Sequence, residues 1–441
     1  MDRKEKVDSI VRAEYVLPMD EGLPVVRDGA VAVSNGRIVS VGSSQEIFRE
    51  YQADKVLGGN GRVVFPGLIN THTHAAMVLF RGLADDLPLK EWLERHIWPA
   101  EAKWLGPEFI SNAIELACLE MLKAGITVFH DMYFFGDITG ITAKRMGIRA
   151  VLGVGILDFP TIVAETSDQY FEKAEAFIRD WKGDDLIRPS IAPHALYTCG
   201  PDTLKRAKKL AEAYDIPIHI HLSETQWEIG EIQSRYAKRP VHHLEAIGFL
   251  SERVLAAHCV WLEDEEIDLL ARRRVNVSHC IESNLKLASG IAPVTKMLRA
   301  GIRVTFGTDG AASNNDLNVL SEMSTAAKLH KAVSNDPTAL DAKTALLMAT
   351  RWGAEALGLG GIAGSIEKGN SADLVVANLV RPHLMPLYDI YSHIVYSMRA
   401  SDVETVMVGG KVVVEDGVFR NGDEAVILDK ARKWGERIKN Q

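Results

Sequence analysis

The side chains best suited to chemistry in this sequence are histidines and carboxylates near the ends of short apolar segments. Two histidines one residue apart, His72 and His74, end the segment at residues 63–74. Side chains alternate across a strand, so this spacing puts both imidazoles on one side, where they can share a metal ion. A lone pair of this kind also arises by chance on polar surfaces, so the pair alone leaves chance and metal binding equally open.

The same residue types recur at the ends of five later apolar segments. In chain order they are His194, then His219, His221 and Glu224 of the run IHIHLSE, then His258, His279 and Asp309. One polar group at a strand end is usually an ordinary hydrogen-bonded side chain. Six such ends are hard to explain by packing alone.

The spacing of these residues predicts one metal site. His219 and His221 lie on the same side of their segment, but His221 is nearer its end. We therefore predict that His221 binds the metal and that His219 lies beneath it as a supporting residue. Three imidazoles and one carboxylate would leave a coordination position for water, as in catalytic sites. The predicted ligands are His72, His74, His221 and Asp309.

Other polar and aromatic residues have simpler interpretations. His130, at the end of the second segment, is predicted to form a hydrogen bond at the edge of the core. Trp92, Trp98 and Trp104 recur at roughly helical spacing, which favours packing over a binding surface. The remaining histidines, in helical or loop context, are interpreted as surface or structural residues; they are His96, His242, His243, His330, His383 and His393.

The segments that carry the candidate residues alternate with amphipathic helical stretches. The predicted strands are residues 63–74, 126–132, 149–158, 187–197, 216–224, 254–261, 275–284 and 303–310. Helices are predicted between them, for example at residues 108–124, 201–214 and 263–273. Eight such units fit a closed (β/α)8 TIM-type barrel of the α/β class, whose active site lies at the C-terminal ends of the strands. A doubly wound open sheet is the alternative, but no GxGxxG follows an early strand to support it.

Both ends of the chain are rich in short β patterns. The predicted strands there are residues 10–17, 30–34, 38–41, 372–376, 403–408 and 411–414. The predicted hairpin turns are Gly36-Arg37 and Gly409-Gly410. We therefore predict a small composite β-sandwich domain from residues 1–66 and 372–441, with a catalytic barrel domain from residues 67–371 between them.

The composition excludes several classes of function. Of 441 residues, 47% are apolar and 25% are charged, as in ordinary globular proteins. A formal net charge of −9 argues against nucleic-acid and membrane-surface roles, because both need basic faces. No apolar signal segment or membrane span is evident, so we expect a soluble, cytoplasmic protein. The four cysteines form no CxxC pair, which disfavours disulfides and a thiolate zinc site.

Five motifs together resemble those of a known family. They are PGLINTHTH, HIHLSE, AAHCVWL, SHCIESNLKLASGIAPV and TFGTDGAASNN. They are similar to motifs of the metal-dependent amidohydrolase superfamily and, within it, of the 5-methylthioadenosine/S-adenosylhomocysteine deaminases. HxH alone is a weak signal, but HxH, HxxE and TDG in that order on the first, fifth and eighth strands are specific. The resemblance covers nearly the whole chain and implies hydrolytic deamination of methylthioadenosine, S-adenosylhomocysteine or adenosine.

The resemblance also implies a cofactor and two substrate contacts. It implies one divalent ion per subunit, zinc or iron(II), on the four predicted ligands. The fourth strand has no lysine of the kind that a binuclear relative would carry, which agrees with one ion. Glu101 matches a carboxylate that binds the ribose hydroxyls, and His194 matches a contact to the purine or the sugar.

One position departs from the family pattern. Some members place an arginine just after the third strand, where it holds the amino-acid carboxylate of S-adenosylhomocysteine, whereas this chain has Gly153-Val154-Gly155. We therefore expect methylthioadenosine or adenosine to be preferred over S-adenosylhomocysteine. An arginine from elsewhere, such as Arg81, could substitute.

The expected reaction replaces the 6-amino group of a purine with oxygen from water. A metal ion lowers the pKa of water toward about 7, which supplies a nucleophile at neutral pH. Asp309 is predicted to ligate the ion and accept the proton of the water, and His258 to orient the nucleophile and stabilise charge. Glu224 is predicted to protonate N1 of the ring and then to help ammonia leave, so it both binds substrate and catalyses.

Three alternatives stay open. The same site could deaminate another amino-heterocycle, such as guanine or a pterin, or displace chloride from a triazine; Glu101 is the main argument for a nucleoside. Hydrolysis of a cyclic ureide is disfavoured because the bridging lysine is missing. A non-catalytic scaffold is disfavoured because it has no reason to keep metal ligands and a proton carrier together. The expected partner is a small molecule, and barrel enzymes of this type are commonly homo-oligomers.

Overall fold

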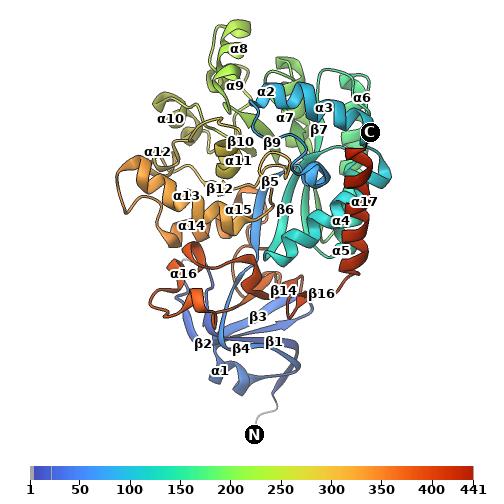
Figure 1. Ribbon diagram of the computed structural model, residues 1–441. Helices are drawn as coiled ribbons and strands as arrows, with labels where there is room; N and C mark the ends of the chain where they lie inside the picture. The colour runs from blue at the N-terminus through green and yellow to red at the C-terminus, as the bar shows by residue number, and fades with distance from the viewer. Residues whose placement is uncertain (1–3, 21, 441) are drawn as a thin grey trace.

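Two eight-stranded sheets organise the chain in the computed structural model, which describes residues 4–20 and 22–440 (Figure 1). One sheet is parallel and holds the middle of the sequence. The other combines strands from both ends of the sequence and lies at one end of the parallel sheet (Figure 1). The candidate residues all belong to the parallel strands and the segments that connect them, so the fold is described mainly for how it positions these residues.

The parallel sheet is closed. Its strands, in order, are β5 (Leu68–Thr73), β6 (Ile126–Tyr133), β7 (Arg149–Ile156), β8 (Ile187–Pro193), β9 (Ile218–Leu222), β10 (Val254–His258), β11 (Asn276–His279) and β12 (Val304–Phe306). The last segment bonds to the first, because the Asp309 amide donates to His72 O at 3.0 Å and the Thr71 hydroxyl donates to Phe306 O at 2.8 Å. The predicted (β/α)8 barrel is therefore confirmed.

Helices surround this barrel. Between its strands lie η1 (Ala75–Phe80), α2 (Leu89–Trp92), η2 (Leu93–Ile97), α3 (Trp98–Trp104), α4 (Pro107–Lys123), α5 (Gly136–Met146), α6 (Ser167–Trp181), α7 (Pro201–Tyr214), α8 (Gln226–Tyr236), α9 (Pro240–Ala246), α10 (Asp264–Arg272), α11 (Ile281–Lys286) and α12 (Val294–Arg299). After β12 come α13 (Val319–Ser334), α14 (Ala342–Met348) and α15 (Arg351–Ala356). Helix α7 shows why they form: Pro201 starts it, and Leu204, Ala207 and Ala211 recur at helical spacing and are buried.

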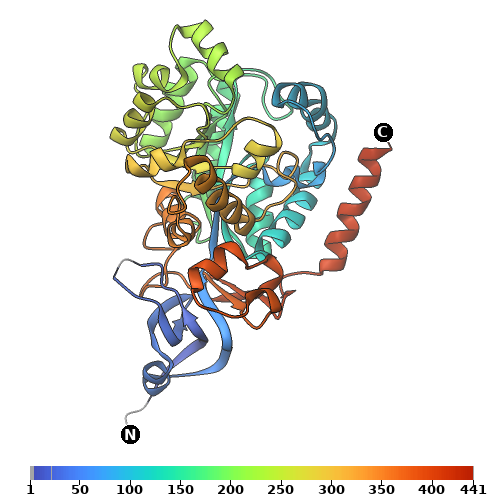
Figure 2. The same ribbon diagram turned by 60° about the vertical axis from the view of Figure 1, so that its left-hand side comes forward.

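The sheet built from the two ends of the chain has the order β16-β15-β14-β13-β4-β1-β2-β3. Its strands are β1 (Glu5–Val16), β2 (Val26–Ser34), β3 (Arg37–Ser43), β4 (Tyr51–Pro66), β13 (Leu374–Asn378), β14 (Val403–Val408), β15 (Lys411–Glu415) and β16 (Val418–Phe419). Its helices are α1 (Ser44–Glu50), η3 (Pro382–Leu384), α16 (Ile390–Tyr396) and η4 (Ala400–Asp402). The last helix, α17 (Glu424–Lys439), leaves this sheet at the right of Figure 2 and contacts α4 of the barrel through Lys430 and Glu115. The domain boundaries at residues 66 and 372 stay a prediction.

Two predicted details of the β segments were wrong. The hairpin turn lies at Asn35-Gly36, one residue before the predicted position, because both have positive φ (51° and 76°) as this tight turn requires. The predicted strand at residues 63–74 is two strands: residues 63–66 end β4, and only Leu68–Thr73 belongs to the barrel. The break falls at Gly67, where a Cβ would lie 1.9 Å from Thr127 Oγ1, so only glycine lets the chain pass between the sheets.

Several barrel strands end earlier than predicted. The fourth, fifth and eighth stop at Pro193, Leu222 and Phe306, so that the polar residues after them lie in loops. All four cysteines are buried and free, as the spacing predicted. In the described part of the chain, no helix is both long and apolar enough to cross a membrane.

Candidate active site

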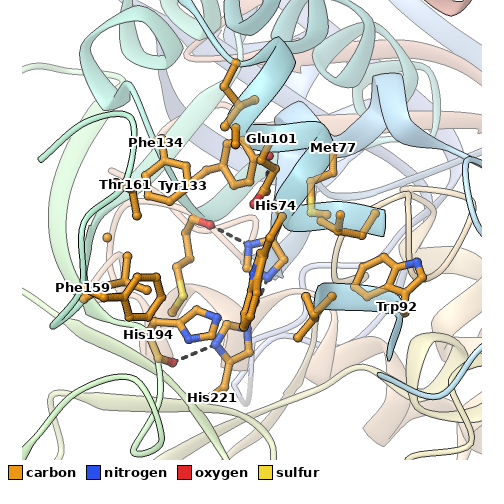
Figure 3. Close-up of a pocket in the computed structure, with 18 of the residues that line it drawn as sticks. His74, Met77, Trp92, Glu101, Tyr133, Phe134, Phe159, Thr161, His194 and His221 are labelled. Carbon is orange, nitrogen blue, oxygen red and sulfur yellow. Dashed lines mark hydrogen bonds between the residues drawn. The ribbon is translucent and has the colours of Figure 1, made fainter. Parts of the chain in front are cut away.

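A cavity of about 300 Å³ opens at the C-terminal ends of the barrel strands, where the fold places an active site. His74, His221 and His194 project into it from one side, and Glu101 and Tyr133 lie on another (Figure 3). Asp309, His258 and Glu224 also line it. The structure therefore brings candidates from strands far apart in the sequence to one cavity.

Four candidate ligands converge at the floor of the cavity. One ring nitrogen from each of His72, His74 and His221 lies within 4.8 Å of the other two. Asp309 Oδ1 lies 3.3 Å from His72 Nε2 and 3.4 Å from His74 Nε2. His72 lies in β5 and His74 directly follows it, so alternation along the extended chain brings the two histidines together, whereas His221 and Asp309 arrive through barrel closure.

The hydrogen bonds and the neutral protonation state of these histidines suit them to bind a divalent cation. His74 Nδ1 donates to Met132 O at 2.6 Å, and His221 Nδ1 donates to His194 O at 2.8 Å, which leaves each Nε2 lone pair directed into the cluster (Figure 3). His72 Nε2 is buried and has no hydrogen-bond partner among the described residues. Burial lowers the pKa of His72 to about 4 and also lowers the pKa of His74 and His221, so all three are neutral at pH 7. Neutral imidazoles are the form that binds metals.

A second layer of histidines supports this cluster from beneath. His72 Nδ1 lies 2.8 Å from His219 Nε2, so with His72 Nε2 free for a ligand, Nδ1 donates to His219. The ring of His219 stacks on that of His130 at 4.0 Å, and His130 Nε2 bonds to Ser190 Oγ at 2.9 Å. The predicted hydrogen bond of His130 is confirmed, although the residue lies in the core rather than at its edge.

Asp309 is held as an anion in a fixed orientation. Its Oδ2 accepts from the hydroxyls of Ser283 at 2.6 Å and Ser313 at 2.8 Å, and its Oδ1 accepts from the Gly310 amide at 2.8 Å. Burial alone would raise the pKa of Asp309, but the adjacent His72 and other imidazoles hold it well below its usual range. The carboxylate thus presents Oδ1 to the histidines.

Glu224 and His258 form an acid–base pair beside the cluster. His258 Nε2 lies 3.7 Å from Glu224 Oε2, and the Ser289 hydroxyl donates to Glu224 Oε1 at 3.0 Å. Burial raises the pKa of Glu224, and the neighbouring His258 only partly offsets it. Burial works to lower the pKa of His258, but Glu224 and Asp309 raise it overall. Asn284 Oδ1 accepts from His258 Nδ1 at 2.8 Å and so fixes the ring.

The two residues assigned to substrate contacts also face the cavity. The Tyr133 hydroxyl donates to Glu101 Oε1 at 2.5 Å, and burial raises the pKa of Glu101 to about 7. His194 Nδ1 lies 3.0 Å from Thr198 Oγ1, and burial lowers the pKa of His194 to about 3. Glu101 therefore offers an acceptor near neutral pH, and His194 offers a neutral imidazole.

Three further interpretations can be compared with the geometry. Trp92 packs in the core as expected and also lines the cavity, and Trp104 packs against Trp434 at 6.2 Å. Trp98 is exposed and lines the cavity, so the packing interpretation was wrong for this residue. Its position on α3, the short helix that also holds Glu101, was the signal that could have found it. Arg81 does not line the cavity and is paired with Glu120. His279 bonds to His330 in the core at 3.0 Å and does not line the cavity.

The chain is similar to known proteins over nearly its whole length. A sequence model described as "Amidohydrolase family" matches residues 63–413. The chain is 55% identical over 433 residues to a 5-methylthioadenosine/S-adenosylhomocysteine deaminase of Thermodesulfovibrio yellowstonii, covering 98% of this chain and 99% of the relative. It is 45% identical over 433 residues to a 5'-deoxyadenosine deaminase of Methanosarcina acetivorans, covering 98% of each chain.

Solved structures show the same architecture. An adenosine deaminase from Xanthomonas campestris with bound zinc superposes with a TM-score of 0.97 at 42% identity, covering 100% of both chains. Atrazine chlorohydrolase from Arthrobacter aurescens, complexed with zinc, superposes with a TM-score of 0.91 at 26% identity, covering 97% of this chain and 100% of that one.

Proposed function

This chain belongs to the amidohydrolase family, and we propose that it hydrolyses the 6-amino group of an adenine nucleoside, releasing ammonia and the inosine-type product. The observation that carries the proposal is one cavity lined by two kinds of polar group. Convergent neutral histidines and Glu224 line it together with the half-buried acceptor Glu101, which the Tyr133 hydroxyl holds. A free base or a triazine has no ribose hydroxyls for Glu101 to bind. The adenine nucleosides in the names of the relatives at 55% and 45% identity agree with this choice.

We also propose that one divalent ion belongs to this enzyme, held by His72, His74, His221 and Asp309. Zinc is the favoured ion because two structural neighbours contain it, with iron(II) as the alternative. When bound, a divalent ion lowers the pKa of a coordinated water and so supplies a nucleophile at neutral pH. The identity of the ion, a cytoplasmic location and a homo-oligomeric state stay predictions.

The remaining chemistry is assigned to residues of the chain. Asp309, an anion at neutral pH, takes a proton from the attacking water. His258, held by Asn284, donates a hydrogen bond to the oxygen that adds to carbon 6. Glu224 has a raised pKa and therefore carries a proton at a pH where an exposed glutamate does not, which suits it to protonate N1. The proton that Asp309 takes from the water is then delivered, with the help of Glu224, to the amino group, which leaves as ammonia.

The cavity wall supports a preference for an uncharged 5' substituent. Among the described residues, no lysine or arginine lines the cavity, and Met77, Phe134 and Phe159 contribute apolar and aromatic surface to it (Figure 3). The carboxylate of a homocysteinyl group would have no cation to pair with there. Burying a charge without a partner is costly. Methylthioadenosine, 5'-deoxyadenosine and adenosine are therefore the proposed substrates ahead of S-adenosylhomocysteine.

Ammonia release from a panel of compounds tests this function. We expect kcat/KM for methylthioadenosine and 5'-deoxyadenosine to exceed that for S-adenosylhomocysteine by at least about tenfold, since a buried unpaired charge opposes binding. Guanine and cytosine serve as contrasting compounds in the same assay, and a chlorotriazine is tested beside them by the release of chloride. Turnover confined to these three would contradict the nucleoside assignment.

Glu101 has its own expected effect. Glu101→Gln should raise KM for adenosine by about 10- to 100-fold with a smaller change in kcat, because a hydrogen bond to a charged group contributes about 1.5–3 kcal/mol. Since the pKa of Glu101 is about 7, kcat/KM of the wild type should rise with pH through that value as the carboxylate forms. In Glu101→Gln, kcat/KM should no longer rise with pH through about 7.

Steady-state kinetics between pH 5.5 and 8.5 (a range of about 1.5 units on either side of that pKa) measure both effects. Glu108→Gln, at an exposed position on α4, is the matched control and should leave KM unchanged. An unaltered KM in Glu101→Gln would remove Glu101 from the substrate contacts.

A further inference from the structure

The turn that carries Glu224 is bound by a second, deeper glutamate. Glu224 lies just after β9, next to Ser223, whose φ is 53°. The Ser223 amide donates to Glu228 Oε1 at 2.9 Å, and the Glu224 amide donates to Glu228 Oε2 at 2.8 Å. Glu228 lies in the first turn of α8 and is 1% exposed. One buried carboxylate thus holds two consecutive amides of the turn.

This arrangement differs from ordinary helix capping in the same chain. In α1, Glu46 accepts from the amide of the N-cap residue Ser43, and in α10, Glu266 accepts from the amide of the N-cap residue Glu263. In α8 the N-cap is Thr225, but Glu228 reaches past it to the two preceding residues. A glutamate that served only to cap α8 would bind the Thr225 amide.

The burial of Glu228 also indicates a role beyond capping α8. Within residues 4–20 and 22–440, Glu228 forms no ion pair with a lysine, arginine or histidine, so the hydrogen bonds from the Glu224 and Ser223 amides are the main interactions that offset its burial. Burying a carboxylate whose only partners are amides costs free energy, and capping the N-terminus of a helix does not require burial, since an exposed glutamate can also cap. The burial of Glu228 is explained if its carboxylate positions Glu224, whose amide it binds.

The rest of the turn is also held. Ser223 O accepts from the amides of Val260 at 3.0 Å and Trp261 at 2.8 Å, and the Ser289 hydroxyl holds the Glu224 carboxyl. Glu224 is therefore fixed at its side chain by Ser289 and at its main chain by Glu228. Glu228 itself does not line the cavity that contains His74 and Glu101.

We infer that Glu228 is a positioning residue for proton transfer by Glu224, acting through the backbone of the turn without touching substrate. The inference rests on the proposed function, because it requires Glu224 to carry a proton to the substrate. Loss of the Glu228 carboxylate would free the turn and move the Glu224 carboxyl away from the place where N1 must bind. Proton transfer is sensitive to such displacement, since it needs hydrogen-bond distance.

Glu228→Gln tests the inference. The amide keeps the shape of the side chain, but its NH2 group would face one of the two backbone N–H groups. We expect kcat for adenosine to fall by about 10- to 100-fold, the range found for residues that orient an active-site group, with KM and bound metal close to wild type. Glu266→Gln, a buried glutamate at the same helix position of α10, is the matched control and should keep wild-type kcat per bound metal.

A double-mutant cycle with Glu224→Gln separates positioning from general damage. If Glu228 acts only through Glu224, then Glu224→Gln and Glu224→Gln/Glu228→Gln should have equal kcat, whereas independent effects would multiply. Should Glu228→Gln fail to fold, Glu228→Asp carries the same test, since it keeps the charge and shortens the reach. Multiplying losses, or a wild-type kcat in Glu228→Gln, would overturn the inference alone. A wild type that releases no ammonia from any nucleoside would overturn the proposed function, and this inference with it.

Discussion

Glu224→Gln is expected to retain its metal and to lose about 10²- to 10⁴-fold in kcat, the contribution typical of a positioned general acid or base. This corresponds to about 3–5 kcal/mol of activation free energy. The glutamine keeps the shape of the side chain and can still accept from Ser289, but it has no proton to give to N1. His258, 3.7 Å away, loses the carboxylate that raises its pKa, so its own hydrogen bonding to the reacting oxygen changes as well.

Elemental analysis and single-turnover kinetics measure the two parts of this prediction. The metal content should equal that of the wild type, because Glu224 is not among the four converging ligands. The rate of the chemical step should fall, with a smaller change in the binding of the product inosine. Near-normal turnover would remove Glu224 from the mechanism, and loss of metal would instead make it a ligand.

His72→Ala should abolish stable metal binding, and activity with it. His72 is fully buried, and its Nε2 atom has no other partner among the described residues, so its removal takes away a ligand that nothing nearby can replace. Loss of a residue behind a ligand typically costs about 10- to 100-fold in metal affinity, so loss of the ligand itself should exceed about 100-fold. Asp309→Ala should behave in the same way, because Oδ1 is the only carboxylate oxygen within 3.4 Å of the His72 and His74 Nε2 atoms in the described chain.

Competition with a chelator measures the metal affinity of each variant, and we expect the affinity to decrease in steps. The metal affinity of His219→Ala, which removes only the hydrogen-bond partner of His72, should lie between the affinities of the wild type and His72→Ala. His243→Gln is the control, since this buried histidine stacks on Tyr236 and lies outside the cavity. Full occupancy in both His72→Ala and Asp309→Ala would contradict the ligand set.

Much of the barrel could be predicted from local patterns. Alternation along the extended chain puts His72, in β5, and His74, directly after it, on one side whatever surrounds them, because the period of a strand is a property of its backbone. The order of strand and helix segments similarly constrains a parallel sheet. Strand ends were predicted less well, because hydropathy continues past the last ladder hydrogen bond into buried loops such as the one that holds Asp309.

Only part of the candidate active site could be predicted from local sequence patterns. Glu101 was assigned by family resemblance, since spacing alone made it a solvated helix residue, and its contact with Tyr133 depends on how the α2–α3 segment folds over the barrel. Trp98 was assigned to packing because helical spacing does not say which face meets a cavity. Glu228 was missed, although Thr225 and Glu228 have the spacing of a capping box.

The sequence by itself therefore predicted which residues could bind a metal and, for His72 and His221, which strand carries them and which side of it they occupy, because these follow from short-range geometry. Only the tertiary structure shows that His72 lies against His219, how the loop after β12 turns Asp309 Oδ1 toward His72, and that Glu228 turns back to the Glu224 amide. These contacts join segments whose relative positions depend on barrel closure and loop conformation. No local pattern encodes them, because each requires two surfaces to be buried against one another at the same time.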